Sequence, residues 1–156
     1  MIRLAQKSDL DRVLQITRLC AREMESRKVF QWNEHYPDRQ SFVNDINNSE
    51  LYVYCIQDMV IGCVSICAFM DEVYSKVSWK TDGKNSVYVH RLAVDPKHQK
   101  HGVGSKLMDF AENESKLNGF FLNINKYLTF LCFIFQLMKR SRGYWRKMLF
   151  SINMGT

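Results

Sequence analysis

The sequence predicts an α/β (α+β) fold in which helices flank a central β-sheet, and three stretches carry this prediction. Residues 86–94 form a β-branched, largely apolar run that is typical of a strand covered on both faces. A loop with two glycines and an apolar helical stripe follow directly, and Gly119 ends the helix. Residues 51–68 predict a β-hairpin with a tight turn at Asp58-Met59. The 156 residues suffice for one core, so we expect a single domain over residues 1–156.

The remaining elements follow from local signals. A short strand is expected at residues 2–4, and Ser8 is expected to cap a helix that runs to about Ser26, with Asp11 completing a capping box. After a loop at residues 29–37, Asp38 is expected to cap a second helix. Residues 69–85 form a long polar connection, and a last strand is expected at about residues 120–125.

Gly62 lies inside the second strand of the hairpin. A glycine at such a position marks a β-bulge or a close approach of another part of the backbone.

The composition is that of an ordinary soluble globular protein, with 46% apolar and 24% charged residues. The formal net charge of +6 suits an anionic ligand, and it would also suit a nucleic acid. The basic residues are scattered apart from a cluster in residues 139–147, and no nucleic-acid-reading motif is present in the sequence. We therefore expect no nucleic-acid partner.

The cysteines indicate a reducing compartment. The five show no metal-binding or disulfide spacing, and most lie in apolar patterns: Cys20, Cys55, Cys63, Cys67 and Cys132. We expect buried free thiols, a cytoplasmic protein and no metal site. The chain starts directly with a strand, so no signal peptide is expected, and the longest apolar run, residues 127–135, is too short to cross a membrane.

The loop between the 86–94 strand and the following helix predicts an anion site. Gly102 and Gly104 let the backbone approach a ligand, and the first-turn N–H groups of a helix are free to donate. The cationic side chains nearby are Lys97, Lys100, His101 and Lys106. The expected ligand is a phosphate or pyrophosphate. The loop is not a Walker loop, and it lacks the third glycine of a dinucleotide fingerprint.

The stretch HRLAVDPKHQKHGVGSKLMDFAE closely resembles the acetyl-CoA-binding motif of the GNAT family of N-acetyltransferases. Gln99, Gly102 and Gly104 match the family pattern Gln/Arg-x-x-Gly-x-Gly/Ala, and residues 91–96 match the strand before it. The resemblance covers roughly residues 1–124. It implies a mixed, mostly antiparallel sheet flanked by helices, a splayed central strand pair, and acetyl-CoA (coenzyme A) as co-substrate without a metal.

The resemblance also implies which residues hold the cofactor. In the family the splay leaves unpaired backbone groups on the central strand, and the pantetheine amides pair with them like an added strand. Carried onto this sequence, the expected cofactor-binding residues are Leu92, Ala93, Val94, Gln99, Lys100, His101, Gly102, Val103, Gly104 and Ser105. Dimers are frequent in families of this kind, and a homodimer is compatible with the sequence.

The implied reaction is direct attack of a neutral primary amine on the thioester of acetyl-CoA, which requires a base. A carboxylate base is expected near the central strand, but that strand has none; Glu72, His90 and Glu34 are the candidates. For His90, a strand histidine hydrogen-bonded to its neighbours is the favoured interpretation over a base. Arg91 is expected to be a structural or phosphate-side cation.

The resemblance places the first two helices and their connection on the side of the acceptor. The acceptor is a small-molecule or peptide amine, and its candidate contacts are Trp32, Glu34, His35 and Tyr36. The other interpretation is a loop held in place by its aromatic side chains.

After about residue 121 the sequence departs from the family pattern. Residues 128–137 are nearly all apolar, and the Tyr-Glu-Lys that carries the usual general acid is missing. A frameshift in the coding sequence and a genuine variant tail both account for this. The departure also motivates an alternative function, a catalytically impaired acyl-CoA-binding protein of the same fold.

Overall fold

The computed structural model describes residues 1–68 and 85–123. Glu72 and the tail from residue 124 lie outside these residues. Along the described chain, the elements are β1 (Ile2–Leu4), the 3-10 helix η1 (Lys7–Asp9), α1 (Leu10–Ser26), α2 (Arg39–Asn47), β2 (Leu51–Ile56), β3 (Met59–Cys67), β4 (Ser86–Val94), the 3-10 helix η3 (Pro96–His98), α3 (Val103–Leu117) and β5 (Phe121–Asn123).

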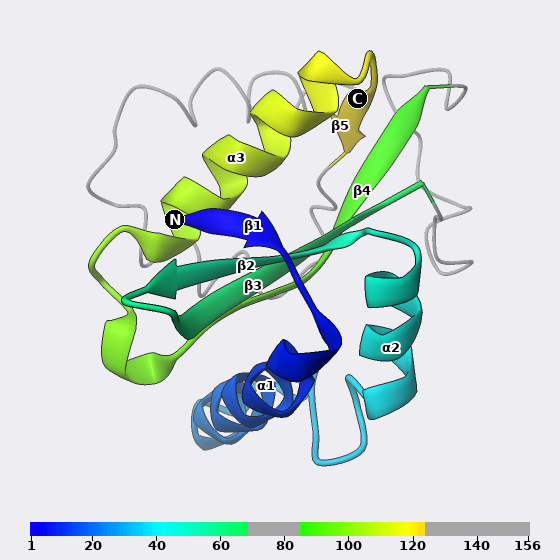
Figure 1. The fold of residues 1–156 in the computed structure, drawn as a ribbon. Coiled ribbons are helices and arrows are strands. Elements are labelled where there is room, and N and C mark those ends of the chain that lie inside the picture. Colours follow the sequence, from blue (N-terminus) through cyan, green and yellow to red (C-terminus); the bar gives the residue numbers. More distant parts are fainter. Residues whose placement is uncertain (69–84, 124–156) are drawn as a thin grey trace, which may run out of the picture.

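The five described strands form one sheet in the order β1-β2-β3-β4-β5. The first three pairs are antiparallel, and β4 and β5 are parallel. In Figure 1, α1 and α2 cover one face of this sheet, and α3 covers the other. The predicted mixed, mostly antiparallel sheet flanked by helices is thus confirmed. No helix among the described segments has the length and apolar character that a membrane crossing requires.

The N-terminal capping prediction is wrong. A 3-10 helix precedes α1, and the side chain that bonds back to the start of this helix is that of Asp9, not of Ser8 or Asp11. The carboxylate of Asp9 accepts a hydrogen bond from the Gln6 N–H (2.7 Å) and two from the Arg3 guanidinium (2.7 and 2.9 Å). The side-chain hydrogen bond from Arg3 holds the pKa of Asp9 below its usual value. The helical segment therefore begins at Lys7, where Gln6 and Asp9 form the capping box, and the same Asp9 is ion-paired to Arg3 of β1.

The hairpin turn lies one residue earlier than expected. Gln57 and Asp58 form the turn, and both have positive φ (46° and 63°). Two consecutive positive φ values are the signature of the tight turn that matches the twist of paired strands. By contrast, the predicted helix caps at Asp38 and Gly119 are confirmed: Asp38 accepts from the Ser41 N–H at 2.8 Å, and Gly119 has φ 75° after the end of α3.

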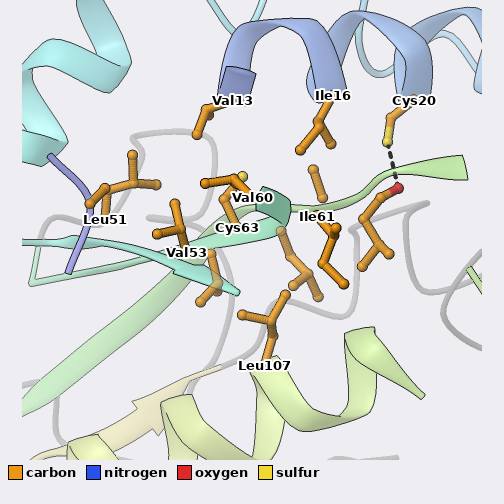
Figure 2. Close-up of a cluster of buried hydrophobic side chains, with 14 of the residues drawn as sticks. Val13, Ile16, Cys20, Leu51, Val53, Val60, Ile61, Cys63 and Leu107 are labelled. Carbon is orange, nitrogen blue, oxygen red and sulfur yellow. Dashed lines mark hydrogen bonds between the residues drawn. The ribbon is translucent and has the colours of Figure 1, made fainter. Parts of the chain in front are cut away.

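The core fills both faces of the sheet (Figure 2). From α1, Val13, Ile16 and Cys20 point toward the sheet, and Leu107 of α3 points toward it from the opposite side. Within the described part of the chain, four of the predicted buried free thiols are confirmed: Cys20, Cys55, Cys63 and Cys67. Cys132 lies outside it.

Gly62 marks the predicted close approach. A Cβ at this position would lie 2.9 Å from the Ala93 carbonyl oxygen and 3.2 Å from Leu107 Cδ1. The pairing of β2 with β3 also changes register opposite this residue, between Tyr54 and Cys55. The missing side chain therefore allows β4 and α3 to pack closely on β3.

We predict that Gly62→Ala lowers the free energy of unfolding by about 1–3 kcal/mol, because a methyl group cannot fit without moving the β4 backbone. Urea denaturation measures this change. Gly104→Ala is the matched control, since its Cβ would meet only Val94 Cγ2 at 3.9 Å and alanine favours the helix. Equal stability of Gly62→Ala and the wild type would contradict the close packing.

Candidate functional site

The junction after β4 is fixed by Asp95, which is 2% exposed. Its Oδ1 accepts from the Lys97 N–H (2.9 Å), and its Oδ2 accepts from Arg12 Nη2 (2.5 Å). Arg12 Nε also donates to the Val60 carbonyl at 3.0 Å, so β3 holds in place the guanidinium that binds this carboxylate. Burial alone would raise the pKa of Asp95, but these hydrogen bonds outweigh it and the pKa lies below its usual value.

The loop that follows is held by its own polar groups. The Gln99 side chain turns inward, and its Nε2 donates to the Val94 carbonyl at 3.1 Å. His101 Nδ1 lies 2.7 Å from the Gln99 carbonyl, which can only accept, so Nδ1 donates. Lys100 and Gly102 both have left-handed backbones (φ 65° and 78°). For a residue other than glycine this conformation costs about 1–2 kcal/mol.

The loop leads directly into the N-terminus of α3. The N–H of Lys106 donates to the Gly102 carbonyl at 3.0 Å, which places the preceding N–H groups in the helix's first turn, before its first internal bond. Gly104 and Ser105 are half-buried there, while Lys97 and Lys100 are exposed. Lys106 points elsewhere, since its Nζ lies 3.4 Å from the Tyr54 hydroxyl and over the Tyr54 ring. An anion at the predicted site would therefore be bound by backbone N–H groups rather than by Lys106.

The expected free backbone on β4 is only partly available. The Asp95 N–H donates to the Ile61 carbonyl. Hydrogen-bonded and non-hydrogen-bonded residue pairs alternate along an antiparallel ladder. Ala93, two residues before Asp95, therefore directs its backbone groups toward its partner Cys63 of β3. The Val94 carbonyl accepts from Gln99 Nε2 and from Cys20 Sγ (3.3 Å). The expectation that all three residues present unpaired groups is therefore wrong for Ala93 and for the Val94 carbonyl.

Leu92 and the Val94 N–H face the other way, toward the side of β5. Within the described residues, β5 pairs only with Ser86, Val87 and Tyr88. Within the described chain, the ladder between β4 and β5 therefore extends to Tyr88. The splay of this strand pair beyond residue 123 lies outside the described chain.

Sequence reasoning missed a buried polar cluster beside this strand. Arg91 donates from Nε and Nη2 to the two carboxylate oxygens of Asp45 (2.9 and 2.7 Å), and Ser65 Oγ donates to the same carboxylate at 2.5 Å. Asp45 is 3% exposed. A carboxylate three residues after the buried Phe42 on a short helix was the available signal, because such a group needs a partner. Arg91 is thus a structural cation, one of the two roles expected of it.

The acceptor-side loop is held in a fixed turn. Asn33 Oδ1 accepts from the N–H groups of His35 and Tyr36 (2.8 and 2.9 Å), and the Asn33 N–H donates to the Tyr36 carbonyl at 3.0 Å. Glu34 Oε1 lies 3.3 Å from His35 Nε2, and both side chains are about 85% exposed. Trp32 is buried.

A hollow of about 470 Å³ lies between α1 and this loop. It combines two arginines and two glutamates with apolar side chains, and its lining comprises Arg18, Ala21, Arg22, Glu25, Phe30, Trp32, Asn33 and Glu34. Two of the predicted acceptor contacts, Trp32 and Glu34, therefore lie in one cavity. Its mixed charge suits a ligand with both an ammonium group and an anionic group.

The candidate bases are dispersed. His90 is partly buried on β4 opposite Ser65 of β3, whereas Glu34 is exposed at the acceptor loop. Cys20 reaches the end of β4, but burial raises the pKa of its thiol to about 12. The thiol is neutral at pH 7, and a neutral thiol is a poor nucleophile.

The comparisons with known proteins agree with this architecture. The family model described as "Acetyltransferase (GNAT) family" matches residues 10–131, well over half of the chain. The chain therefore belongs to the GNAT acetyltransferase family. No curated protein matches it.

Solved structures share the fold at low sequence identity. A protein from Staphylococcus aureus Mu50 assigned as an acetyltransferase is 24% identical, with a TM-score of 0.67 over 86% of this chain and 89% of that one. PaiA N-acetyltransferase from Thermoplasma acidophilum, in complex with coenzyme A, is 16% identical (TM-score 0.63, 87% and 85% covered). Ribosomal-protein-alanine N-acetyltransferase from Brucella melitensis is 19% identical (TM-score 0.58, 80% and 72% covered).

We predict that Asp95→Asn lowers the free energy of unfolding at pH 7 by about 1–3 kcal/mol. The pKa of Asp95 is depressed in the folded state, so its carboxylate stabilises the fold above its unfolded pKa of about 4 and loses that effect as the pH falls through the folded pKa. The difference between variant and wild type should therefore shrink below about pH 4. Denaturation curves at pH 7, 5 and 3.5 measure it.

Asp109→Asn is the matched control for this pH dependence. Burial and the neighbouring Glu112 raise the pKa of Asp109, which is the opposite direction. Its replacement should not reduce stability at pH 7. A pH-independent loss in Asp95→Asn would contradict the role assigned to the charge.

Proposed function

We propose that this protein transfers an acetyl group from acetyl-CoA to a primary amine. The observation that carries the proposal is the continuous path from the β4 backbone through the left-handed loop to the α3 N-terminus. Free N–H groups in the first turn of a helix suit a pyrophosphate, and so does Gly102, which has nothing within 4 Å of its missing Cβ. Membership of the GNAT family supports the same ligand.

In this proposal the cofactor contacts run in chain order. The pantetheine pairs with the β5-facing backbone of Leu92 and with the Val94 N–H, and the pyrophosphate lies on residues 99–105. Lys97 and Lys100 are exposed beside this loop and add attraction for the phosphates. Gln99 acts indirectly, because its side chain is engaged with Val94 and shapes the loop from inside.

Two structural neighbours support the chemistry proposed. PaiA N-acetyltransferase was solved with coenzyme A, and the Brucella protein is a ribosomal-protein-alanine N-acetyltransferase. We infer that an amine acceptor enters from the side of the acceptor loop, where the hollow contains Trp32 and Glu34. Small amine, antibiotic, polyamine and protein N-terminus are the acceptor classes to be compared.

Direct transfer fits the local chemistry. The amine nitrogen attacks the thioester carbon, the C–S bond breaks, and coenzyme A leaves as a thiolate that must be protonated. The neutral Cys20 thiol near the end of β4 is not suited to form an acyl intermediate. A backbone N–H of β4 serves as donor to the thioester oxygen, and His90 is the base that we favour because it lies on this strand.

We predict that Gly102→Glu abolishes coenzyme A binding in a calorimetric titration of the purified chain, because it places a carboxylate in the loop that should hold the pyrophosphate. Gly119→Glu is the matched control. It has nearly the same left-handed φ and equally open space at the opposite end of α3, so backbone strain is equal. Loss of binding in both variants, or in neither, would contradict the assignment of this loop.

We further predict that thiol release from acetyl-CoA depends on an added amine, and that His90→Gln lowers kcat by about 100-fold. Glu34→Gln is the comparison, since the exposed Glu34 is the rival base among the described residues. A larger loss in Glu34→Gln would transfer the role to that residue. Coenzyme A binding without amine-dependent thiol release, across the whole acceptor panel, would favour the alternative of an impaired acyl-CoA-binding protein.

A further inference from the structure

The buried cluster of Asp45, Ser65 and Arg91 joins three elements at one point. Asp45 lies in the last turns of α2, Ser65 in β3 and Arg91 in β4. The Asp45 carboxylate accepts three hydrogen bonds of 2.5 to 2.9 Å, two from one guanidinium. Burial alone would lower the pKa of Arg91, yet the bonds to Asp45 keep it above its usual value. The pair is therefore charged and geometrically specific.

Arg91 is also the residue at which β4 changes register. Cys63 pairs with Ala93, whereas Ser65 pairs with His90, so β4 has one residue more than β3 across this step. The extra residue is a β-bulge, and Arg91 has a positive φ of 48°. Arg91 thus has a left-handed backbone, which is unfavourable for a residue with a side chain, and its own side chain is held by two hydrogen bonds to Asp45.

The bulge separates β4 into two functional parts. Before it, residues 86–88 pair with β5; after it, Leu92 and Val94 direct backbone groups toward the side where the described part of β5 does not reach. A one-residue shift in a strand reverses which side each backbone group faces. Loss of the bulge would therefore turn Leu92 and the Val94 N–H away from the proposed pantetheine path.

The same guanidinium lies close to the acceptor side. Tyr36 contributes to the raised pKa of Arg91, and Arg91 contributes, after the Ser41 hydrogen bonds, to the lowered pKa of Asp38. These residues come from the end of the acceptor loop and the N-cap of α2. Arg91 thus bonds to Asp45 of α2, the helix that follows the acceptor loop, while forming part of β4.

We propose that Arg91 and Asp45 are positioning residues: their ion pair holds the β4 bulge against α2 and so sets the orientation of the coenzyme A-binding backbone. This proposal rests on the proposed function for its ligand. The pair is not in contact with the expected cofactor atoms, and it acts through the backbone of Leu92 and Val94.

The test compares two bidentate pairs of the same chain. Asp45→Asn removes the negative charge of the positioning pair, and Arg91→Lys removes its paired guanidinium hydrogen bonds. Asp9→Asn and Arg3→Lys do the same to the Arg3–Asp9 pair, which also has two short bonds (2.7 and 2.9 Å) but joins β1 to η1. Thermal melting followed by circular dichroism gives the stability of each variant, and calorimetric titration gives its Kd for coenzyme A.

We expect all four variants to melt at lower temperature than the wild type, and only Asp45→Asn and Arg91→Lys to bind coenzyme A more weakly, by about tenfold or more. The proposal is overturned if Asp45→Asn and Arg91→Lys both keep wild-type affinity while losing as much stability as the control variants. The pair would then be a purely structural contact.

Hydrogen exchange of the unliganded protein supplies a readout that does not depend on the cofactor. Asp45→Asn should speed exchange by about tenfold at the amides that pair with β3 after the bulge, those of Ala93 and Asp95, relative to those of Val87 and Tyr88. If the wild type fails to bind coenzyme A, the proposed function fails, while the exchange pattern still decides the positioning role. Equal acceleration along all of β4 would refute that role.

Discussion

One buried carboxylate determines how the chain leaves β4. Asp95 accepts from Arg12 of α1 and from the Lys97 amide, while its own N–H donates to Ile61 of β3. The chain therefore turns at a fixed angle into η3. Gln99 can then reach back to the Val94 carbonyl, and the two left-handed residues bring the backbone to the start of α3. Without this fixed exit, the loop and the strand would not share one ligand path.

The two halves of the central strand β4 differ in their pairing. Its first residues are buried and pair with β5, and pairing with β3 begins at Tyr88. Its last residues pair with β3 on one side only within the described chain, and a bulge with an unfavourable φ separates the two parts. Interactions elsewhere in the fold offset the cost of such a conformation, and here Asp45 holds the side chain of Arg91, the residue with the positive φ. The functional geometry of β4 therefore depends on α2, an element on the acceptor side.

The elements that sequence reasoning predicted are those set by local chemistry. The β-branched run, the Asp95-Pro96 stop and the left-handed Gly119 each act over a few residues, so β4, α3 and the end of α3 could be predicted. The bonds that shape the site could not, because their partners are distant in sequence: Asp45 and Arg91 are 46 residues apart, and Arg12 and Asp95 are 83 apart. Lys106 shows the same limit, since only the fold reveals that Tyr54 engages its ammonium group.

The proposed cofactor and acceptor sites offer different chemistry on the two faces of the sheet. On the side of α3, the loop presents backbone N–H groups, with a helix dipole that favours any phosphate of suitable shape. On the side of α1, the hollow presents side chains of both charges, Arg18 and Arg22 against Glu25 and Glu34. Backbone donors cannot be exchanged by substitution, whereas side chains can. Variation in acceptor choice is therefore expected on the α1 side. In the positioning role proposed for Arg91 and Asp45, their ion pair couples α2 on that side to the orientation of β4.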